Sequence, residues 1–371
     1  MGLLGALLQL WSRELMIGTA AAGHCFLALT LGLTASKLLA ARVSGTGLEI
    51  RRLFIVAGSL ASLTLLALSA VYEAAWLLPL LLSMGLAVGA LTTGIAWLLY
   101  GTLTVHRTPE ILNLAGVSFG AGAVMVCVLV WAIVDVFTVQ VILCLVAVIP
   151  AMLAVQAWRS PIFQHFKLPE PPAQLSWRET LNPTAALLAA SLFFQAANHW
   201  TVGGWLPFYL SRKFGVPTST SIGMLSAFWL ALTWGRVLAT RVSSLERHTR
   251  WLLTPTAACL LGCIFLLQTV ETSGLLVGSL MLGAGIGALH PLTIGAVLNR
   301  YPYYHPGLLN GFFSLSFVGA MVVPWLVGQV AAGLGIETII WSVLAGSLMV
   351  FLLMAVVVLE TRLARKALAT R

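Results

Sequence analysis

The chain alternates between long apolar stretches and shorter polar connections. Each stretch has about the length that an α-helix needs to cross the core of a bilayer, roughly 20 residues. Barrel strands would be shorter and would alternate in polarity, and a backbone in lipid must satisfy its own N–H and C=O groups, so helices are predicted. The eleven expected transmembrane helices are residues 18–41, 54–72, 76–100, 111–134, 138–157, 184–210, 218–240, 251–270, 274–298, 307–333 and 337–359.

The connections alternate between very short ones, around Glu73, Asp135 and Glu271, and longer basic ones. The longest carries prolines at 161, 169, 171 and 172, which deny it a continuous helix, although Ser176 and Glu179 have the spacing of a capping box for a short surface helix. We therefore interpret it as a linker between two halves. The predicted units are an N-terminal bundle at 1–157, a linker at 158–183, and a C-terminal bundle with its tail at 184–371.

Composition agrees with a membrane protein. Hydrophobic residues make up 60% of the 371 positions and charged residues only 8%, with a mean hydropathy of +0.99; soluble domains carry about 25% charged residues. The net charge of +9 need not indicate a nucleic-acid partner, because placing the long connections on one side of the membrane gathers there all basic residues except Arg13, Arg212 and Lys213. This bias predicts a multi-pass protein of the cell (inner, plasma) membrane, with the long loops and the C-terminus in the cytoplasm.

Two parts of the chain are nearly the same sequence. Residues 31–44 read LGLTASKLLAARVS and residues 230–243 read LALTWGRVLATRVS, with eight of fourteen positions identical. Matching segments end on the same side of the membrane, so the halves are predicted to be parallel and related by an axis along the membrane normal, on a plan of six helices plus six. The repeat continues in GALLQLWSREL at 5–15 with GWLPFYLSRKF at 204–214, in MGLAVGALT at 84–92 with LGAGIGALH at 282–290, and in Ser118-Phe119 with Ser316-Phe317.

The repeat leaves the start of the second half without a partner. Met1 aligns with Trp200, so residues 184–199 have no counterpart, and the apolar run at 2–11 is too short to cross a bilayer. Either the true start lies upstream, or the protein lacks half a helix; we favour the first. The predicted fold is an all-α integral membrane protein of two parallel pseudo-symmetric bundles, with eleven full spans and a partial first helix.

Several segments carry a family resemblance, together with the two parallel halves, the basic loop after the second helix of each half and the long linker. They are GGWLPFYLSRKFGV (203–216), SAFWLALTWGRVLATRV (226–242), LNLAGVSFGAGA (112–123), GAGIGALHPLTIGAVLNRYP (283–302) and LNGFFSLSFVGAMVVPWLVG (309–328). With these features the sequence resembles the major facilitator superfamily, and more narrowly its fucose-permease-like sugar transporter branch. The resemblance implies a secondary active transporter in which two halves rock about a central site, with a sugar as the favoured solute and a proton or another ion as a possible coupling partner. The family's basic loop usually contains an Asp that is absent here, which puts the charge-relay form of its inner gate in doubt.

Polar residues within the predicted spans are the candidates for a solute site. Gln195, Asn198 and His199 lie at i, i+3 and i+4 and share one helix face, with Trp200 next to them. A ring beside amides suits a small neutral polar solute such as a sugar, because the ring covers its apolar side and the amides hold its hydroxyls. The alternative is that these residues join helices by hydrogen bonds.

Further candidates come from the repeat and from the helix ends. His290, which the repeat aligns with Thr92, precedes Pro291; a helix broken there would be a binding position, and a kink with a satisfied histidine is the alternative. All eleven carboxylates fall in loops or at helix ends, so proton coupling through a buried acid has no support in this chain. The pseudo-symmetric pair Asn113 and Asn310 adds candidates that could equally be caps or packing contacts. Gating is predicted for the cytoplasmic-end cations, which could also serve only for orientation: Lys37, Arg42, Arg236 and Arg241.

Other functional classes are weaker readings of the same residues. An integral membrane enzyme would need a nucleophile or carboxylate beside His199 or His290, and no such partner lies in the spans. A non-transporting remnant or a membrane interaction protein would fit the short first helix. Glycines at i and i+4, as in Gly85 with Gly89, predict close helix contacts rather than phosphate binding. We expect no cofactor, no metal and no nucleic-acid partner, and a monomer in the lipid bilayer.

Overall fold

The structure is a computed structural model that describes residues 2–43, 49–102, 108–160, 183–241, 251–300 and 306–369. Within these ranges it is helical, without strands. The expected short helix at Ser176 and Glu179 lies outside the described residues. The elements are α1 (Gly2–Glu14), α2 (Thr19–Val43), α3 (Ile50–Ser69), the 3-10 turn η1 (Ala74–Trp76), α4 (Leu77–Thr102), α5 (Thr108–Ile133), α6 (Val139–Arg159), α8 (Pro183–Phe214), α9 (Thr218–Arg241), α11 (Leu253–Gln268), α12 (Thr272–Arg300), α13 (Pro306–Leu334) and α14 (Thr338–Ala369).

Each of the predicted spans corresponds to one helix, from α2 to α14. Nine of them, within the described ranges, are long and apolar enough to cross a membrane by themselves. The two others differ for separate reasons. Helix α11 has only 16 residues, and the hydropathy of α8 is lowered by Gln195, Asn198 and His199 near its middle. Helix α14 continues ten residues past its predicted end, into a basic segment that hydropathy alone excludes.

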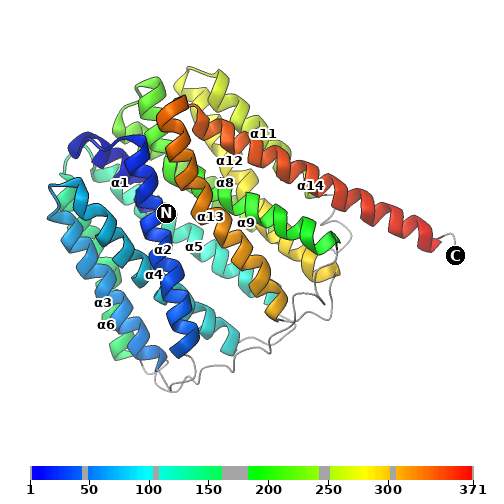
Figure 1. Cartoon of the computed structure of the whole chain (residues 1–371), viewed down its shortest axis with the longest axis horizontal. Coiled ribbons are helices and arrows are strands. Elements are labelled where there is room, and N and C mark those ends of the chain that lie inside the picture. The colour runs from blue at the N-terminus through cyan, green and yellow to red at the C-terminus, as the bar shows by residue number, and fades with distance from the viewer. Residues whose placement is uncertain are drawn as a thin grey trace.

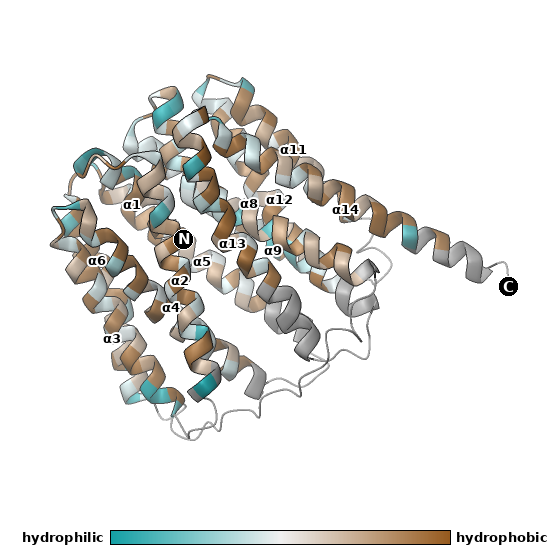
Figure 2. Ribbon diagram, viewed as in Figure 1, coloured by the Kyte–Doolittle hydropathy of each residue, from teal (hydrophilic) through white to brown (hydrophobic). Residues whose placement is uncertain are grey.

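The helices form two bundles, one in each half of the chain (Figure 1). The bundles contact each other through α1, α2, α5, α8, α9 and α13. Brown, apolar residues run along the helices, and teal residues gather mainly near helix ends and connections (Figure 2). The connections after α1, α3, α5, α8, α11 and α13 are short and share one end of the molecule, which we call the short-loop end. The opposite end, where α2, α4, α9 and α12 end, is the long-loop end.

Packing is nearly the same in the two halves. Helix α2 packs on α4 as α9 packs on α12, and α3 packs on α4 and α6 as α11 packs on α12 and α14. The contacts between the halves also come in pairs, because α5 lies against α9 while α13 lies against α2, and α1 lies against α8. The predicted fold, with two parallel pseudo-symmetric bundles, is therefore confirmed.

Glycines at i and i+4 set the closest of these contacts. A β-carbon on Gly85 would overlap the carbonyl oxygen of Leu29, and one on Gly287 would overlap that of Leu232. Leu232 stands 199 positions after Leu33, whose carbonyl oxygen meets Gly89 in the same way. The predicted role of these glycines in close helix packing is confirmed, since only a residue without a side chain allows such an approach.

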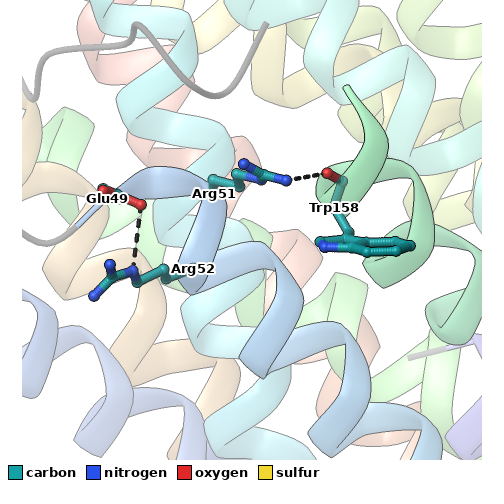
Figure 3. A network of polar contacts seen from close by, with 4 residues as sticks. All are labelled: Glu49, Arg51, Arg52 and Trp158. Atoms are coloured by element: carbon teal, nitrogen blue, oxygen red, sulfur yellow. Dashed lines mark hydrogen bonds and ion pairs between the residues drawn. The ribbon is translucent and has the colours of Figure 1, made fainter. Parts of the chain in front are cut away.

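At the long-loop end of the N-terminal half, α3 is fastened to α6. Arg51 donates a hydrogen bond to the backbone carbonyl oxygen of Trp158, and Arg52 forms an ion pair with Glu49 at 3.3 Å (Figure 3). The Arg52 pair is mostly exposed and adds little stability. Arg51 satisfies a carbonyl oxygen in the last turn of α6. Both arginines lie at the start of α3, near the membrane surface, where a long side chain can keep its charge in water.

Candidate functional site

The polar residues of α8 reach different neighbours. Gln195 is buried and donates to the hydroxyls of Ser191 and of Thr293 on α12, both at 2.9 Å. Asn198, also buried, donates to the hydroxyl of Ser347 on α14 at 3.0 Å. Gln195 and Asn198, which were predicted to share one helix face, therefore contact two different helices. Asn198 is turned toward α14 because its amide finds a hydroxyl there, which is the helix-joining alternative.

His199 points instead toward the boundary between the halves. Its ring lies edge-on to Trp229 of α9, with centroids 5.2 Å apart, and to Phe119 of α5 at 6.3 Å. Phe119 and Trp229 also meet edge-to-face at 5.9 Å. The guanidinium of Arg236, further along α9, lies 5.9 Å from the centre of the Phe119 ring. We call Phe119, His199, Trp229 and Arg236 the Phe119 cluster.

A second cluster stands where the repeat predicts its counterpart. The Lys37 ammonium of α2 lies 4.1 Å from the centre of the Phe317 ring on α13. Trp200, the neighbour of His199 on α8, meets the same ring edge-to-face at 6.4 Å. We call Lys37, Phe317 and Trp200 the Phe317 cluster.

The two clusters are built alike. The repeat aligns Lys37 with Arg236 and Phe119 with Phe317. In each cluster, a cation from one half lies against a ring from the other half. Helix α8 contributes to both, through His199 and Trp200.

Arg236 is held without a carboxylate. It is only 9% exposed, and it donates a hydrogen bond from a terminal nitrogen to the backbone carbonyl oxygen of Gly116 on α5. Its Nε has no hydrogen-bond partner among the described residues. The ion pairs found in the described part of the chain join Arg52 to Glu49 and Lys213 to Glu337, so neither involves Arg236.

The other predicted site residues do not belong to either cluster, or their side chains are not among those that the structure describes. Thr92 is exposed and donates to the carbonyl oxygen of Gly89 in its own helix at 3.0 Å. His290 is half-buried on α12, which continues through Pro291, so the expected break is absent. Membrane helices tolerate proline when neighbouring groups satisfy the freed carbonyl. Arg42 is exposed near the end of α2. The side chains of Asn113, Asn310 and Arg241 lie outside the described set.

The short-loop end is closed by close contacts between the halves. A β-carbon on Gly328 of α13 would lie 2.8 Å from the α-carbon of Gly23 on α2. The amide of Gln329 donates to the carbonyl oxygen of Ala20 at 3.1 Å. Arg13 donates to the hydroxyl of Thr218 at 2.6 Å, which ties α1 to α9. At Gly23 and Gly328 the two backbones therefore approach closely.

Three ring residues of the clusters were missed as site candidates in the sequence: Phe119, Trp229 and Phe317. Phenylalanine and tryptophan in an apolar helix look like ordinary core or lipid-facing residues. A signal was nevertheless present, because the repeat aligns Ser118-Phe119 with Ser316-Phe317 as it aligns Lys37 with Arg236.

Comparison with known proteins agrees with this architecture. The structure superposes on a nucleoside transporter, NupG, with a TM-score of 0.69 at 16% identity over 95% of this chain and 94% of that chain. A point mutant of NupG gives a TM-score of 0.72 at 16% identity, covering 95% of each chain. A bacterial homologue of the human lysosomal transporter Spinster, in an inward-facing and occupied conformation, gives 0.66 at 11% identity over 96% of this chain and 92% of that chain.

At these identities the structural likeness concerns the fold alone. No curated protein matches the chain. The family model for the Major Facilitator Superfamily, by contrast, matches residues 1–317, which is most of the sequence. The chain therefore belongs to the major facilitator superfamily.

Proposed function

We propose that the protein is a secondary active transporter that moves a small polar solute by rocking its halves about the α8 region. The observation that carries the proposal is the Phe119 cluster, in which a half-buried histidine, two rings and an arginine from both halves meet at their boundary. Membership of a family of transporters supports transport over the enzyme alternative. The moving units in this proposal are residues 1–157 and 184–371, joined by the linker at 158–183.

A sugar-like solute is the proposed cargo. Phe119 is 48% exposed although its ring contacts α8 and α9, so part of this side chain remains accessible to a solute. Rings suit the apolar face of a sugar, and the Gln195 carbonyl oxygen, which has no partner among the described residues, can accept from a hydroxyl. A nucleoside is the second candidate, because its base could stack on the same rings and because the fold resembles that of a nucleoside transporter.

We further propose that the long-loop end faces the cytoplasm of a cell membrane. The basic residues of the long connections support this orientation. The cluster cations would then lie in the cytoplasmic half of the helices.

Uptake into proteoliposomes tests the transporter proposal. The full chain should accumulate at least one of a panel of labelled hexoses, pentoses, hexuronates and nucleosides, with or without a pH gradient.

His199→Ala should raise the KM for the transported solute, because the His199 ring forms part of the proposed site. Asn198→Ala should lower the free energy of unfolding by about 1 kcal/mol, because the Asn198 amide donates a hydrogen bond to Ser347 on α14. It should leave the KM for the solute unchanged.

The remnant or interaction-protein alternative predicts no flux of any solute in that panel. Such a result, from protein that is monodisperse and folded, would contradict the transporter proposal. Equal effects of the two variants on KM would instead remove His199 from the site and leave the proposal standing.

The cation–ring pairs are proposed to hold the long-loop end closed. Lys37 and Phe317 join α2 to α13, and Arg236 and Phe119 join α9 to α5. A cation over a ring is worth about 0.5–2 kcal/mol. Two such contacts would bias the rocking equilibrium without the acidic residue that the family's basic loop usually contains.

Phe317→Leu should therefore shift the equilibrium toward a conformation open at the long-loop end, by roughly 2- to 30-fold. The reporter is Thr34→Cys, whose position faces Met321 across the same boundary, in a Cys144→Ser background that removes the exposed native thiol. Labelling of Thr34→Cys by a water-soluble maleimide should accelerate in Phe317→Leu and not in Phe265→Leu, an exposed phenylalanine of α11. Unchanged labelling in both would contradict a gating role.

A further inference from the structure

The charged residues inside the described spans are basic, with one exception. Lys37 lies within the span Thr19–Ala40 and Arg236 within Thr218–Ala239. Apart from Glu360 at the last position of its span, the carboxylates that the structure describes lie outside the spans. A charge in the low-dielectric core of a membrane protein is costly unless it is paired. The boundary between the halves therefore has an excess of positive charge that no described side chain neutralises.

Arg236 shows where this excess is concentrated. A guanidinium has five N–H donors; one of those on Arg236 goes to the carbonyl oxygen of Gly116, and Nε has no partner among the described residues. The Phe119 ring covers one side of the group with partial negative charge but accepts no strong hydrogen bond. The side chain is thus buried, held in place and short of acceptors.

The neighbours of Arg236 would suit the remainder of a polar solute. His199 Nε2 is buried and has no partner within the described set, and its ring touches the same Phe119 that Arg236 touches. The unpartnered nitrogen of Trp229 does not belong to this group, because it is directed toward Gly2 of α1. The site thus offers a cation at one end, a ring at its side and a histidine at the other end.

We propose that the transported solute carries a carboxylate that binds Arg236, so that the substrate class is a small hydroxylated monocarboxylate such as a hexuronate. This inference rests on the proposed function and uses the same site. The carboxylate neutralises the buried guanidinium and accepts its free Nε–H together with a terminal N–H, in the two-pronged geometry that arginine favours. Hydroxyls of the solute then lie over Phe119 toward His199.

A monoanion fits this arrangement better than a dianion or a neutral sugar. Lys37, the span cation of the other cluster at the boundary between the halves, is engaged with Phe317. One arginine therefore remains to balance one negative charge. A neutral sugar would leave the guanidinium uncompensated, and a phosphate monoester would bring a second charge without a partner.

The experiment compares three probes with the same carbon skeleton on the full chain in proteoliposomes. Labelled glucuronate, glucose and glucose 6-phosphate differ in one group only: a carboxylate, a hydroxyl or a phosphate. Hydrogen bonds to charged groups contribute about 1.5–3 kcal/mol, so glucuronate should be preferred over glucose by about 10-fold or more in kcat/KM. Glucuronate should also raise the thermal stability of the detergent-purified chain more than glucose does.

Two variants assign the preference to Arg236. Arg236→Gln should lower the ratio of kcat/KM for glucuronate to that for glucose by at least about 10-fold. It should also abolish the thermal stabilisation by glucuronate. Arg236→Lys keeps the charge without the fork and should retain part of both. Arg212→Gln is the matched control, because Arg212 also stacks on a ring, that of Phe208 at 5.4 Å, but lies at the short-loop end; its preference should equal that of the natural chain.

The outcomes separate this inference from the transporter proposal. Flux of glucose or of a nucleoside without flux of glucuronate overturns the monocarboxylate and leaves the transporter. Preference for glucose 6-phosphate, or a glucuronate preference that survives Arg236→Gln, also overturns it. If no probe is transported, stabilisation by glucuronate that Arg236→Gln abolishes supports the site while contradicting transport, and absence of that stabilisation overturns both.

Discussion

Replacing Gly85 by alanine is expected to destabilise the protein by about 1–3 kcal/mol, although alanine is the better helix former. A β-carbon at this position would overlap the carbonyl oxygen of Leu29. The same added β-carbon would lie 3.0 Å from the α-carbon of Gly32. Both obstacles are backbone atoms of α2, so no side chain can turn aside. Helices α2 and α4 would have to separate along their whole contact.

The matched control is Gly122→Ala on α5, where no described atom lies within 4 Å of the added carbon. That change should be neutral or stabilising by up to about 1 kcal/mol, because it removes only the conformational freedom of glycine. The pseudo-symmetric Gly287→Ala should behave like Gly85→Ala, since its added carbon meets the carbonyl oxygen of Leu232.

The chain carries its own reporter for this measurement. Cys25, Cys127, Cys259 and Cys263 are buried, and only Cys144 is exposed. In a Cys144→Ser background, a thiol-reactive dye should follow unfolding as the four buried thiols become accessible. Equal melting temperatures for Gly85→Ala and Gly122→Ala would contradict the backbone contact between α2 and α4.

The fold could be predicted from the sequence because lipid imposes a single backbone solution on long apolar segments. The boundaries were predicted within a few residues for most helices, since Gly, Pro and charged residues mark the ends. Helix α14 was the exception: its last turns are basic, and a helix that leaves the membrane gives no hydropathy signal. The offset of the repeat predicted the pairing of the halves, because a duplicated sequence repeats its packing.

The site could be predicted only in part. Gln195 and His199 were predicted as candidates because polar side chains in an apolar helix are conspicuous, and their part in a site stays a prediction. Which way each turns depends on partners far along the chain, such as Ser347 for Asn198, and no local pattern encodes them. Phe119 and Phe317 could not be predicted as site residues, because aromatic side chains are common in membrane helices. What distinguishes these two rings is the cation from the other half that lies against each of them, and this contact is seen only in the structure.

Gly328→Trp is expected to abolish transport while leaving the protein folded. The β-carbon would lie 2.8 Å from the α-carbon of Gly23 and 3.0 Å from the carbonyl oxygen of Thr19, so an indole has no room between α13 and α2. A transporter that alternates must close this end in one half of its cycle. The substitution should hold the short-loop end open and stop the cycle. Gly333→Trp on the same helix is the control, because no described atom lies within 4 Å of its added carbon.

Two cysteine reporters distinguish a locked molecule from an unfolded one. In the Cys144→Ser background, labelling of Gln329→Cys at the short-loop end should accelerate in Gly328→Trp, because α13 would separate from α2 where position 329 lies against Ala20. Labelling of Thr34→Cys, which faces Met321 toward the other end, should slow down. Unfolding would accelerate both, and a helix pair that merely loosens would leave the second unchanged. Opposite changes at the two ends follow only if the halves move as rigid bodies about a point between them, so a parallel change would reject the rocking model itself.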